Sequence, residues 1–319
     1  MASGKEIRRR IKSIKNTGKI TRAMEMVSAA KMRKAISSVL QLRPYAHAAW
    51  NVLTNLSQAF EHYQKGLLEV REVKSVLAII ITSNRGLCGS FNSQLIKKVK
   101  EEIRNPDKLK INRIGVKKIQ SNVANENLKI DFVTIGKKGE RFLRKMGKEI
   151  VATFPELTYL PKIEDVAPLA KIVIQDYLEK KYEKVVIIYT DYVSAIRQET
   201  KIRQILPISK IDIEKQIAEM DVLGKEYGLD NREIEYLVEP SPEEVLEFIL
   251  PRLIEVQIYH AILESNASKE SSRMMAMKNA TEAAGEMAED LTFVYNQIRQ
   301  MKITQEIAEI SAGRAALEN

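Results

Sequence analysis

The stretch best suited to chemistry is a glycine-containing loop, Thr82-Ser83-Asn84-Arg85-Gly86-Leu87-Cys88-Gly89-Ser90-Phe91-Asn92. It follows an apolar run typical of a buried strand and opens a helix-like stretch, which is where many proteins bind a phosphate. However, it lacks both the GxGxxG spacing and the Gly-Lys-Ser/Thr ending of the common phosphate loops. We therefore predict a tight strand-to-helix turn, with phosphate binding as the alternative.

The remaining candidates for an active site are weaker. His47, His62 and His260 are isolated in the sequence, so no pair has the spacing of metal ligands. Cys88 is the single cysteine, which rules out an intramolecular disulfide and is typical of a reducing compartment. It has no histidine nearby to activate it, and a buried small residue is the simpler interpretation. We expect no catalytic residue, no metal and no cofactor.

Positive charge is concentrated at the N-terminus. The chain has a net charge of +9, and residues 1–35 carry eleven Lys/Arg against Glu6 and Glu25, so 11 − 2 already gives +9. Such an arm binds nucleic acid, anionic lipid or an acidic protein surface. Basic-zipper proteins pair two chains, whereas here a second helix of the same chain can supply the partner. No aromatic residues interleave with the charges as in single-strand binders, so nucleic acid is not expected.

A long helix must carry the C-terminal quarter of the chain. Ser241-Pro242-Glu243-Glu244 is a helix start, with a capping serine and a proline at the first helical position. No turn cluster follows, so one helix would reach on the order of 110 Å. Pro251 is expected to kink it without ending it. A helix of this length belongs to a coiled coil or a shaft.

Its apolar spacing predicts the face of that coiled coil. Residues seven apart form one column, and residues three later form a second, as in an a/d seam. The two columns are Met277, Ala284, Leu291 and Ile298, and Ala280, Met287, Val294 and Met301. No run of eighteen apolar residues exists in the chain, so no transmembrane segment is expected.

A second long helix is expected from about residue 4 to residue 60. Its apolar stripe starts with Ile7, Ile11 and Ile14 and continues in a shifted phase with Ile20, Met24 and Val27. Pro44 is its single interruption, which we expect to be a kink.

Between the helices, apolar runs alternate with helix-like stretches, which predicts a small α/β domain with a largely parallel sheet. The expected strands are 76–82, 130–135, 149–154 and 184–189, and the expected helices are 92–104, 137–146 and 165–180. Residues 105–128 are interpreted as a long loop or insertion, and 211–236 as weakly helical. The predicted divisions are 1–65 (N-terminal coiled-coil helix), 73–208 (α/β domain), 209–240 (connecting segment) and 241–319 (C-terminal coiled-coil helix).

Two terminal segments resemble the signatures of a known family, the gamma subunit of F-type ATP synthases. The N-terminal motifs are RIKSIKNTGKIT at 10–21 and AMEMVSAAKMRKA at 23–35. The C-terminal motifs are RMMAMKNAT at 273–281 and NQIRQMKITQEI at 296–307. The family also has a segment like the glycine loop, usually with aspartate where this chain has Asn84.

The resemblance implies an α/β fold: a long antiparallel two-helix coiled coil, formed by the N- and C-terminal helices, with a small Rossmann-like α/β domain. It implies a non-catalytic rotating shaft that couples c-ring rotation, driven by protons, to the catalytic beta subunits. The implied partners are an alpha3beta3 hexamer, the epsilon subunit and the membrane c-ring, at the cytoplasmic face of a bacterial plasma membrane. The family's partner contacts map onto Met24, Arg273, Arg299, Gln300, Thr304 and Glu306.

Two further groups complete the expected contacts. Arg8 and Arg9 represent the basic arm. Ile303, Ile307 and Ile310, with Leu317, form an apolar stripe in a phase of its own, pointing away from the seam. We therefore predict that residues 302–319 fray in the isolated chain and become ordered in a complex. The alternative functions are a free-standing coiled-coil adaptor and a nucleotide-binding α/β protein.

Overall fold

The computed structural model describes residues 4–55, 65–114, 117–120, 123–124, 127–154, 160–209, 215, 217–218, 221–222 and 242–317. The chain divides into two units, which we call the coil unit (Met1–Ala29 and Arg273–Asn319) and the sheet unit (Ala30–Ser272). Two helices, α1 (Gly4–Asn55) and α7 (Pro242–Leu317), each contribute residues to both units. In the described part of the chain, no helix has the length and apolarity needed to span a membrane.

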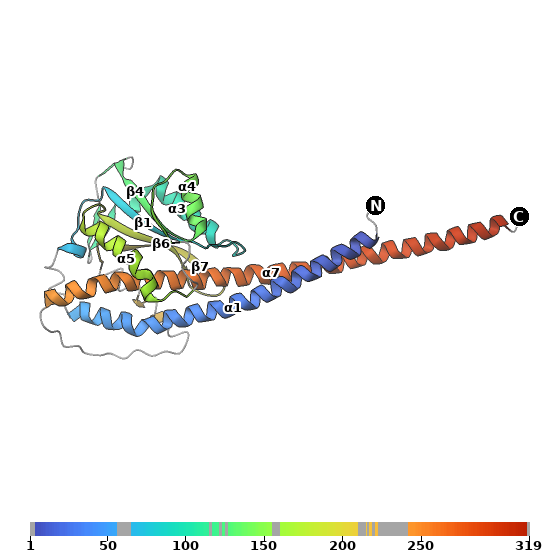
Figure 1. Ribbon diagram of the computed structural model, residues 1–319, viewed down its shortest axis with the longest axis horizontal. Coiled ribbons are helices and arrows are strands. Elements are labelled where there is room, and N and C mark those ends of the chain that lie inside the picture. Colours follow the sequence, from blue (N-terminus) through green and yellow to red (C-terminus); the bar gives the residue numbers. More distant parts are fainter. Residues whose placement is uncertain are drawn as a thin grey trace. The chain divides into compact units, whose positions relative to one another are not determined.

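A five-stranded mixed sheet forms the centre of the sheet unit, in the order β5-β4-β1-β6-β7 (Figure 1). The parallel strands are β1 (Ser75–Ile81), β4 (Lys129–Ile135), β5 (Ile150–Phe154) and β6 (Lys184–Tyr192). Their near-continuous apolar runs are typical of strands buried on both faces. Strand β7 (Gln198–Leu206) pairs with β6 in the antiparallel direction. The predicted α/β domain is confirmed, and β7 is a strand that the prediction missed.

Helices cover both faces of this sheet. Helices α3 (Phe91–Arg104) and α4 (Lys137–Lys145) pack on one face, through an apolar cluster that contains Leu95, Val99 and Leu143. Helix α5 (Ile163–Leu178) packs on the other face. The chain passes from β1 outward to β4 and β5, and α5 then returns it to β6 on the far side of β1. This reversal of direction is the topology of doubly wound α/β folds.

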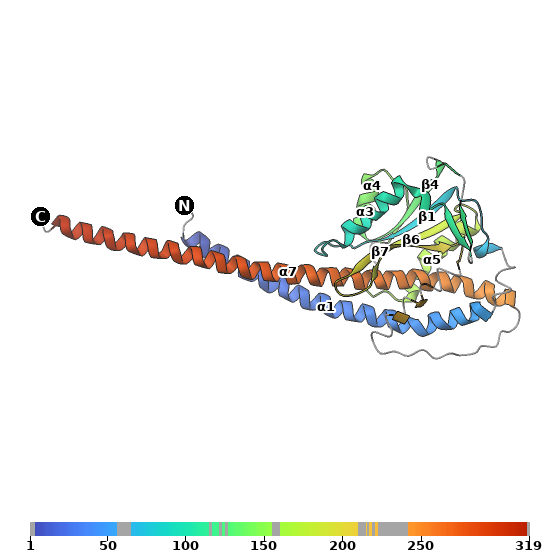
Figure 2. The same ribbon diagram turned by 180° about the vertical axis from the view of Figure 1, so that it is seen from behind.

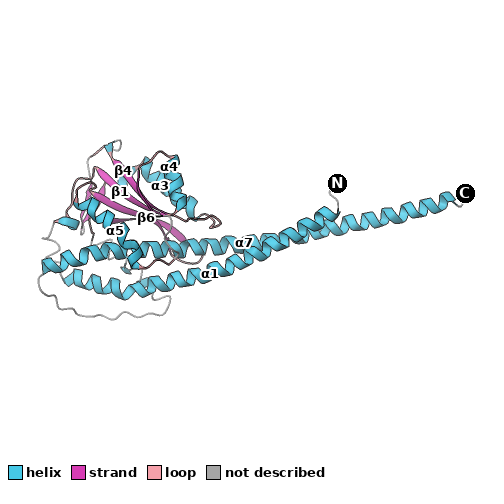
Figure 3. Cartoon of the chain, in the orientation of Figure 1, coloured by secondary structure: helices cyan, strands magenta, loops and turns pink. Residues whose placement is uncertain are grey.

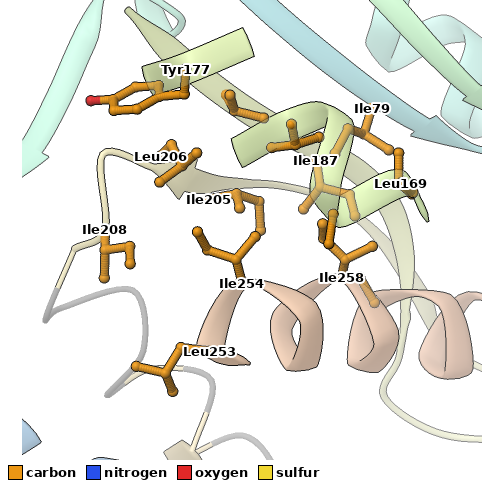
Figure 4. Packing of buried hydrophobic residues seen from close by; sticks show 14 of the residues in the cluster. Ile79, Leu169, Tyr177, Ile187, Ile205, Leu206, Ile208, Leu253, Ile254 and Ile258 are labelled. Atoms are coloured by element: carbon orange, nitrogen blue, oxygen red, sulfur yellow. The ribbon is translucent and has the colours of Figure 1, made fainter. Parts of the chain in front are cut away.

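The first half of α7 packs on the same face as α5. Ile254 and Ile258 of α7 belong to one apolar cluster with Leu169 of α5 and with Ile205 and Leu206 of β7 (Figure 4). Burial of side chains of this size stabilises a fold by about 1.5–3 kcal/mol each. The sheet and the long helix therefore share one hydrophobic core.

The segment 105–128 differs from the predicted loop. It contains a short 3-10 helix, η2 (Pro106–Lys108), and an antiparallel pair of strands, β2 (Ile111–Ile114) and β3 (Lys117–Gln120) (Figure 3). The Lys- and Asn-rich composition hid these strands, because only a few isoleucines mark them. Another 3-10 helix, η1 (Gly66–Leu68), precedes β1. The prediction for 211–236 falls mostly outside the described residues.

Both prolines lie inside helices that continue through them. Pro44 lies within α1 and Pro251 within α7. The prediction that neither proline ends its helix is confirmed.

In the coil unit the two helices are antiparallel. Thr21 lies opposite Thr281 at a hydroxyl separation of 2.8 Å. Gly18 lies opposite Ala284, and Gly4 lies near Tyr295. Residue numbers therefore rise along one helix as they fall along the other, and the C-terminal end of α7 lies beyond the N-terminal end of α1 (Figure 2).

Candidate interaction surface

The seam of the coil unit is the line along which α1 and α7 pack against each other. On α1 it consists of the positions that are turned away from solvent. These positions recur at spacings of four and three residues, the pattern of a helix packed along one stripe. They are Ile7, Ile11, Ile14, Gly18, Thr21, Met24, Glu25 and Ser28. The first three confirm the predicted start of the stripe. The shifted phase is wrong for Ile20 and Val27, which are 61% and 54% exposed.

The seam on α7 follows the same alternation. It runs through Met277, Thr281, Ala284, Ala288, Leu291, Tyr295 and Ile298. The predicted column Met277, Ala284, Leu291 and Ile298 is confirmed. The predicted second column is wrong for Met287, Val294 and Met301, which are 57%, 40% and 59% exposed, whereas Ala280 is half-buried. The second column lies four residues after the first, and the prediction placed it three after.

Small residues in the seam explain why the prediction wrongly placed some large apolar residues there. A Cβ atom on Gly18 would lie 3.4 Å from the Cβ atom of Ala284, so the two helices approach closely there. Thr21 and Thr281 meet through their hydroxyl groups at the next position. Around Gly18 and Thr21 the seam is filled by glycine, alanine and threonine, and the larger Ile20 and Met287 are exposed.

The outward faces of the coil unit therefore carry unusually large apolar side chains. The exposed ones among the described residues are Ile20, Met26, Val27, Met287, Phe293, Val294, Met301, Ile303, Ile307 and Ile310. Single exposed apolar residues are ordinary, but a series of this length on one slender unit is typical of a surface that another protein covers.

A groove runs along one side of the seam. It has a volume of about 920 Å³ and is floored by small residues such as Gly18, Ala284 and Ala288. Lys15, Lys19 and Arg22 of α1 and Glu289 of α7 line its polar sides. The groove adds a concave region to the apolar outer surface.

The tip of α7 has no described residue of α1 opposite it. All residues from Met301 to Arg314 are exposed, including Ile303, Ile307 and Ile310. At 1.5 Å per residue, residues 300–317 extend over roughly 27 Å. The prediction that the tip presents an apolar stripe is confirmed. Its fraying in the isolated chain stays a prediction.

The structure places every expected contact residue in the coil unit. Arg8, Arg9, Arg299, Gln300, Ile303, Thr304, Glu306, Ile307 and Ile310 are exposed, whereas Met24 and Arg273 are half-buried. Glu306 forms an ion pair with Lys302 at 3.8 Å, and both side chains are largely exposed. Pairs of this kind stabilise a helix only weakly, so they remain open to exchange with a partner. Their role as contacts is a proposal.

The glycine loop uses its polar side chains to hold its own shape. Asn92 donates to the Ser83 hydroxyl at 2.8 Å, and Ser83 in turn donates to the carbonyl oxygen of Arg85 at 2.6 Å. The side-chain oxygen Oδ1 of Asn84 accepts from the backbone N–H of Lys137, at the start of α4, at 3.2 Å. Asparagine thus supplies the acceptor that the family's aspartate would supply. The predicted strand-to-helix turn is confirmed.

Two of the histidines that are isolated in the sequence meet carboxylates in the fold. His47 Nε2 lies 2.6 Å from Asp221, which also accepts from Arg43 at 2.9 Å. His260 Nε2 lies 3.3 Å from Glu264. Cys88 is buried, as predicted, and accepts a hydrogen bond from Asn92. Within the described residues, no group of three His, Cys, Asp or Glu is placed to hold a metal ion.

Sequence reasoning missed a buried polar contact between the sheet and α7 in the sheet unit. Asp191 of β6 forms an ion pair with Lys201 of β7, and the two belong to the sheet face that α7 covers. Arg203 lies over the Tyr189 ring at 5.6 Å. Further along, Ser271 donates to the carbonyl oxygen of Ala195 at 2.7 Å, and Ser272 donates to Gln198 at 3.0 Å. The alternation of charged and apolar residues in β7 could have revealed the strand but not its partner.

The charges in this contact are held in defined protonation states. Burial lowers the pKa of His260 from 6.5 to about 3, helped by the positive charge of Arg203, so the imidazole is neutral. Burial alone would raise the pKa of Asp191. A hydrogen bond with Glu264 and the charge of Lys201 outweigh that effect, and the pKa lies below its ordinary value.

Comparison with known proteins gives a consistent result over the whole chain. The family profile described as "ATP synthase" matches residues 3–317. The ATP synthase gamma chain of Roseiflexus castenholzii is 39% identical over 319 residues, covering 99% of each chain. The ATP synthase gamma chain of Legionella pneumophila strain Corby is 35% identical over 317 residues, covering 99% of this chain and 100% of the relative.

Solved structures agree on the fold. A chain in the central stalk and c-ring structure of the Tetrahymena thermophila mitochondrial ATP synthase matches with a TM-score of 0.54 and 25% identity, covering 82% of this chain and 99% of that one. A chain in the rotor structure of the Euglena gracilis mitochondrial ATP synthase matches with a TM-score of 0.59 and 18% identity, covering 94% and 98%.

Proposed function

Because the chain belongs to the ATP synthase gamma-chain family, we propose that its coil unit turns inside a ring of alpha and beta subunits. As a family member it is the gamma subunit of the central stalk, or rotor, and a non-catalytic subunit of the complex. The proposal concerns which surfaces of this chain meet which partners.

The observation that carries this proposal is the outward placement of the large apolar side chains. Met287 is exposed beside a stretch of the seam that uses small residues, and Met301 and Ile307 are exposed at the tip, where no described residue of α1 lies opposite. Exposing such side chains to water has a free-energy cost that a surrounding sleeve of protein would remove. The same outer surface carries Arg299, Gln300 and Glu306, which supply polar contacts between the apolar ones.

The two helices give the shaft different sides. Basic residues of α1, including Arg8 and Arg9, lie on one helix, whereas α7 exposes Glu286, Glu289 and Asp290. A shaft with unlike sides presents a different surface to each of three catalytic sites as it turns. Each site is then biased in sequence toward a different nucleotide affinity, which is a coupling between distant sites.

The sheet unit is assigned to the other partners. We place its contacts with the epsilon subunit and with a proton-driven c-ring, at the cytoplasmic face of a bacterial plasma membrane. The Tetrahymena structure joins central stalk and c-ring, and a Euglena structure joins the c-ring with F1 and OSCP. Those arrangements support the assignment for this chain by analogy.

Hydrogen exchange tests the proposal at the tip. In the isolated chain, the amides of residues 302–317 should exchange rapidly, because no other segment among the described residues covers this stretch of helix. In the assembled complex they should be protected. Strong protection of Ile307 and Ile310 in the free chain would contradict the sleeve.

Substitutions separate the apolar contacts from general effects on the helix. The triple variant Ile303→Ser, Ile307→Ser and Ile310→Ser should fold as the parent does, but it should weaken assembly and lower ATP-driven pumping. The matched control is Lys302→Ser, Gln305→Ser and Glu309→Ser, which changes exposed polar residues of the same turns. Equal losses in both variants would mean that helix propensity, and not contact, is responsible.

The basic arm is tested by salt. Replacing Arg8, Arg9 and Lys12 with glutamine should weaken assembly more at low ionic strength than at high, since salt screens exposed charges. A loss that does not depend on salt would assign these residues to packing.

A further inference from the structure

The helix α7 is buried on nearly all sides between Val256 and Ser272, yet this stretch is rich in polar residues. Gln257, His260, Glu264 and Ser268 are all buried. Polar groups in such a position are tolerated only where they find partners. Glu264 has such a partner in Asp191 of β6, and Ser271 and Ser272 have partners in the β6–β7 turn and at the start of β7. The ring nitrogens of His260 and the hydroxyl of Ser268 have no hydrogen-bond partner among the described residues.

These partners form a ladder in which each step along the helix matches a step along the sheet. We define the polar ladder by the hydrogen bond of Glu264 with Asp191, whose ion-pair partner is Lys201, and by the hydrogen bonds of Ser271 with Ala195 and of Ser272 with Gln198. From Lys201 to Gln198 a strand covers roughly 10 Å. From Glu264 to Ser272 a helix covers roughly 12 Å. Helix and strand therefore keep step along the whole ladder.

Apolar packing could not hold α7 in this way. The cluster around Ile254 and Ile258 favours burial but is non-directional, and helices sliding by small amounts keep most of such contacts. Charged and hydrogen-bonding groups are directional. Shifting α7 by one residue would rotate it by about 100° and move it by about 1.5 Å along its axis. Glu264 would then lie away from Asp191, and buried charges would be left without compensation.

We propose that the polar ladder fixes the rotational and axial register of α7 on the sheet, so that its members are positioning residues for torque transmission. Torque applied to the sheet unit then turns the helix without slip, and the helix continues past residue 272 as one unbroken element. The inference rests on the proposed docking of the sheet unit to the c-ring. The register itself, however, can be measured without any partner.

An apolar variant distinguishes positioning from folding. Replacing a buried ionic group by apolar residues of similar volume is often neutral or stabilising. The variant Asp191→Leu, Lys201→Met and Glu264→Leu should therefore unfold at an unchanged or higher temperature and still assemble. In the assembled enzyme in vesicles, proton pumping per ATP hydrolysed should fall. If the triple variant does not assemble, Asp191→Leu with Lys201→Met, which conserves net charge, is measured in its place.

A second buried polar group in the same unit serves as the control. Tyr182 donates to Asp131 at 2.8 Å, and Lys129 pairs with Asp131 at 2.9 Å. The variant Asp131→Leu, Lys129→Met and Tyr182→Phe removes a comparable set of groups outside the polar ladder. Pumping per ATP hydrolysed should be unchanged. An equal loss in this control would overturn the proposal.

Disulfide cross-linking reads the register directly in the isolated chain. Cysteines at Gln198 and Ser272 should join rapidly, because these side chains share a hydrogen bond, whereas cysteines at Gln198 and Ser268 should join slowly. In the apolar variant the two rates should approach each other, and the 198–272 disulfide should restore pumping. Unchanged cross-linking and unchanged pumping in the apolar variant would overturn the ladder's role. Altered register with intact pumping would overturn the link to torque.

Discussion

The hydroxyl oxygens of Thr21 and Thr281 lie 2.8 Å apart across the seam of the coil unit. Each also lies within hydrogen-bond distance of a carbonyl of its own helix, Gly18 at 3.0 Å and Met277 at 2.8 Å. A hydroxyl has a single proton to donate, so one threonine donates across the seam while the other donates to its own helix. The pair therefore couples the two helices through a specific polar contact.

This pairing predicts a non-additive mutant cycle. Thr21→Val or Thr281→Val alone should lower the free energy of opening of the coil unit by about 1 kcal/mol, because one buried hydroxyl loses its cross-seam partner. The double variant should cost less than the sum, since both groups become apolar together. Hydrogen exchange of the amides at 14–28 measures this. Thr292→Val, which removes a bond within one helix, should show no coupling to Thr21.

The close approach at Gly18 predicts opposite effects for two substitutions. Gly18→Ala places a methyl group at 3.4 Å from the Cβ of Ala284, an ordinary contact, and should stabilise α1 by roughly 0.5–1 kcal/mol through helix propensity. Gly18→Leu must push the helices apart and should cost about 1–3 kcal/mol. Chemical unfolding of the two variants decides the matter. If leucine is tolerated as well as alanine, the seam is looser than described.

Gly136 should be among the least replaceable residues of the sheet unit. Its φ angle is 96°, and a Cβ atom there would lie 2.1 Å from the carbonyl oxygen of Thr82. Gly136→Ala combines backbone strain with a steric clash and should lower the free energy of unfolding by roughly 3 kcal/mol or more. Gly147 has a φ of 66° and nothing within 4 Å, so Gly147→Ala should cost only about 1–2 kcal/mol. Thermal unfolding of both variants tests the contrast, and equal costs would contradict the role of Thr82.

The position of Asn84 predicts that a negative charge there would slightly raise the stability of the sheet unit. Its side chain accepts from the first backbone N–H of α4, where negative charge is favoured. Asn84→Asp should stabilise the sheet unit by about 0.5 kcal/mol at low salt, and this gain should shrink at high salt. Asn84→Ala should cost about 1 kcal/mol. Urea unfolding at two ionic strengths distinguishes the charge from the hydrogen bond.

His260 predicts how stability depends on pH. The folded pKa of about 3 lies below the ordinary 6.5, so between these values the unfolded chain binds a proton that the folded chain does not. Stability is therefore full above pH 6.5 and falls as the pH is lowered, by at most about 1.4 kcal/mol per pH unit for one group. His260→Leu should flatten the slope between pH 4 and 6.5 in urea unfolding. The lowered pKa of Asp191 acts only below 3.8, outside that window.

Much of the fold follows from local patterns. The apolar runs of β1, β4 and β6 and the long uninterrupted helices are local signals, so their positions could be predicted. Strand β7 has a weaker local signal, because Lys201 and Arg203 alternate with its apolar residues. Arg203 is buried and Lys201 is half-buried on the sheet face that α7 covers, and Lys201 pairs with Asp191 of the neighbouring strand, which no local pattern reveals.

In the coil seam, the sequence-based prediction was wrong for a different reason. Hydrophobicity favours Ile20 over Thr21 and Met287 over Ala288 as seam residues, and in both cases the structure selects the smaller one. A pattern argument assumes that the largest apolar residues are buried within the chain. Here the proposed partners would bury them. Periodicity indicated the stripe of Ile303, Ile307 and Ile310 at the tip, whereas the polar contact residues came from the family resemblance.

The small residues of the seam also have a mechanical consequence. The separation of two packed helix axes depends on the side chains between them, and glycine, alanine and threonine bring the axes together. A beam made of two joined rods resists bending in proportion to the square of the distance between the rods. The stretch around Gly18 and Ala284, where the two helices approach closely, is therefore a thin part of the beam. It should flex first under a sideways load, so that the coil unit can store elastic work there.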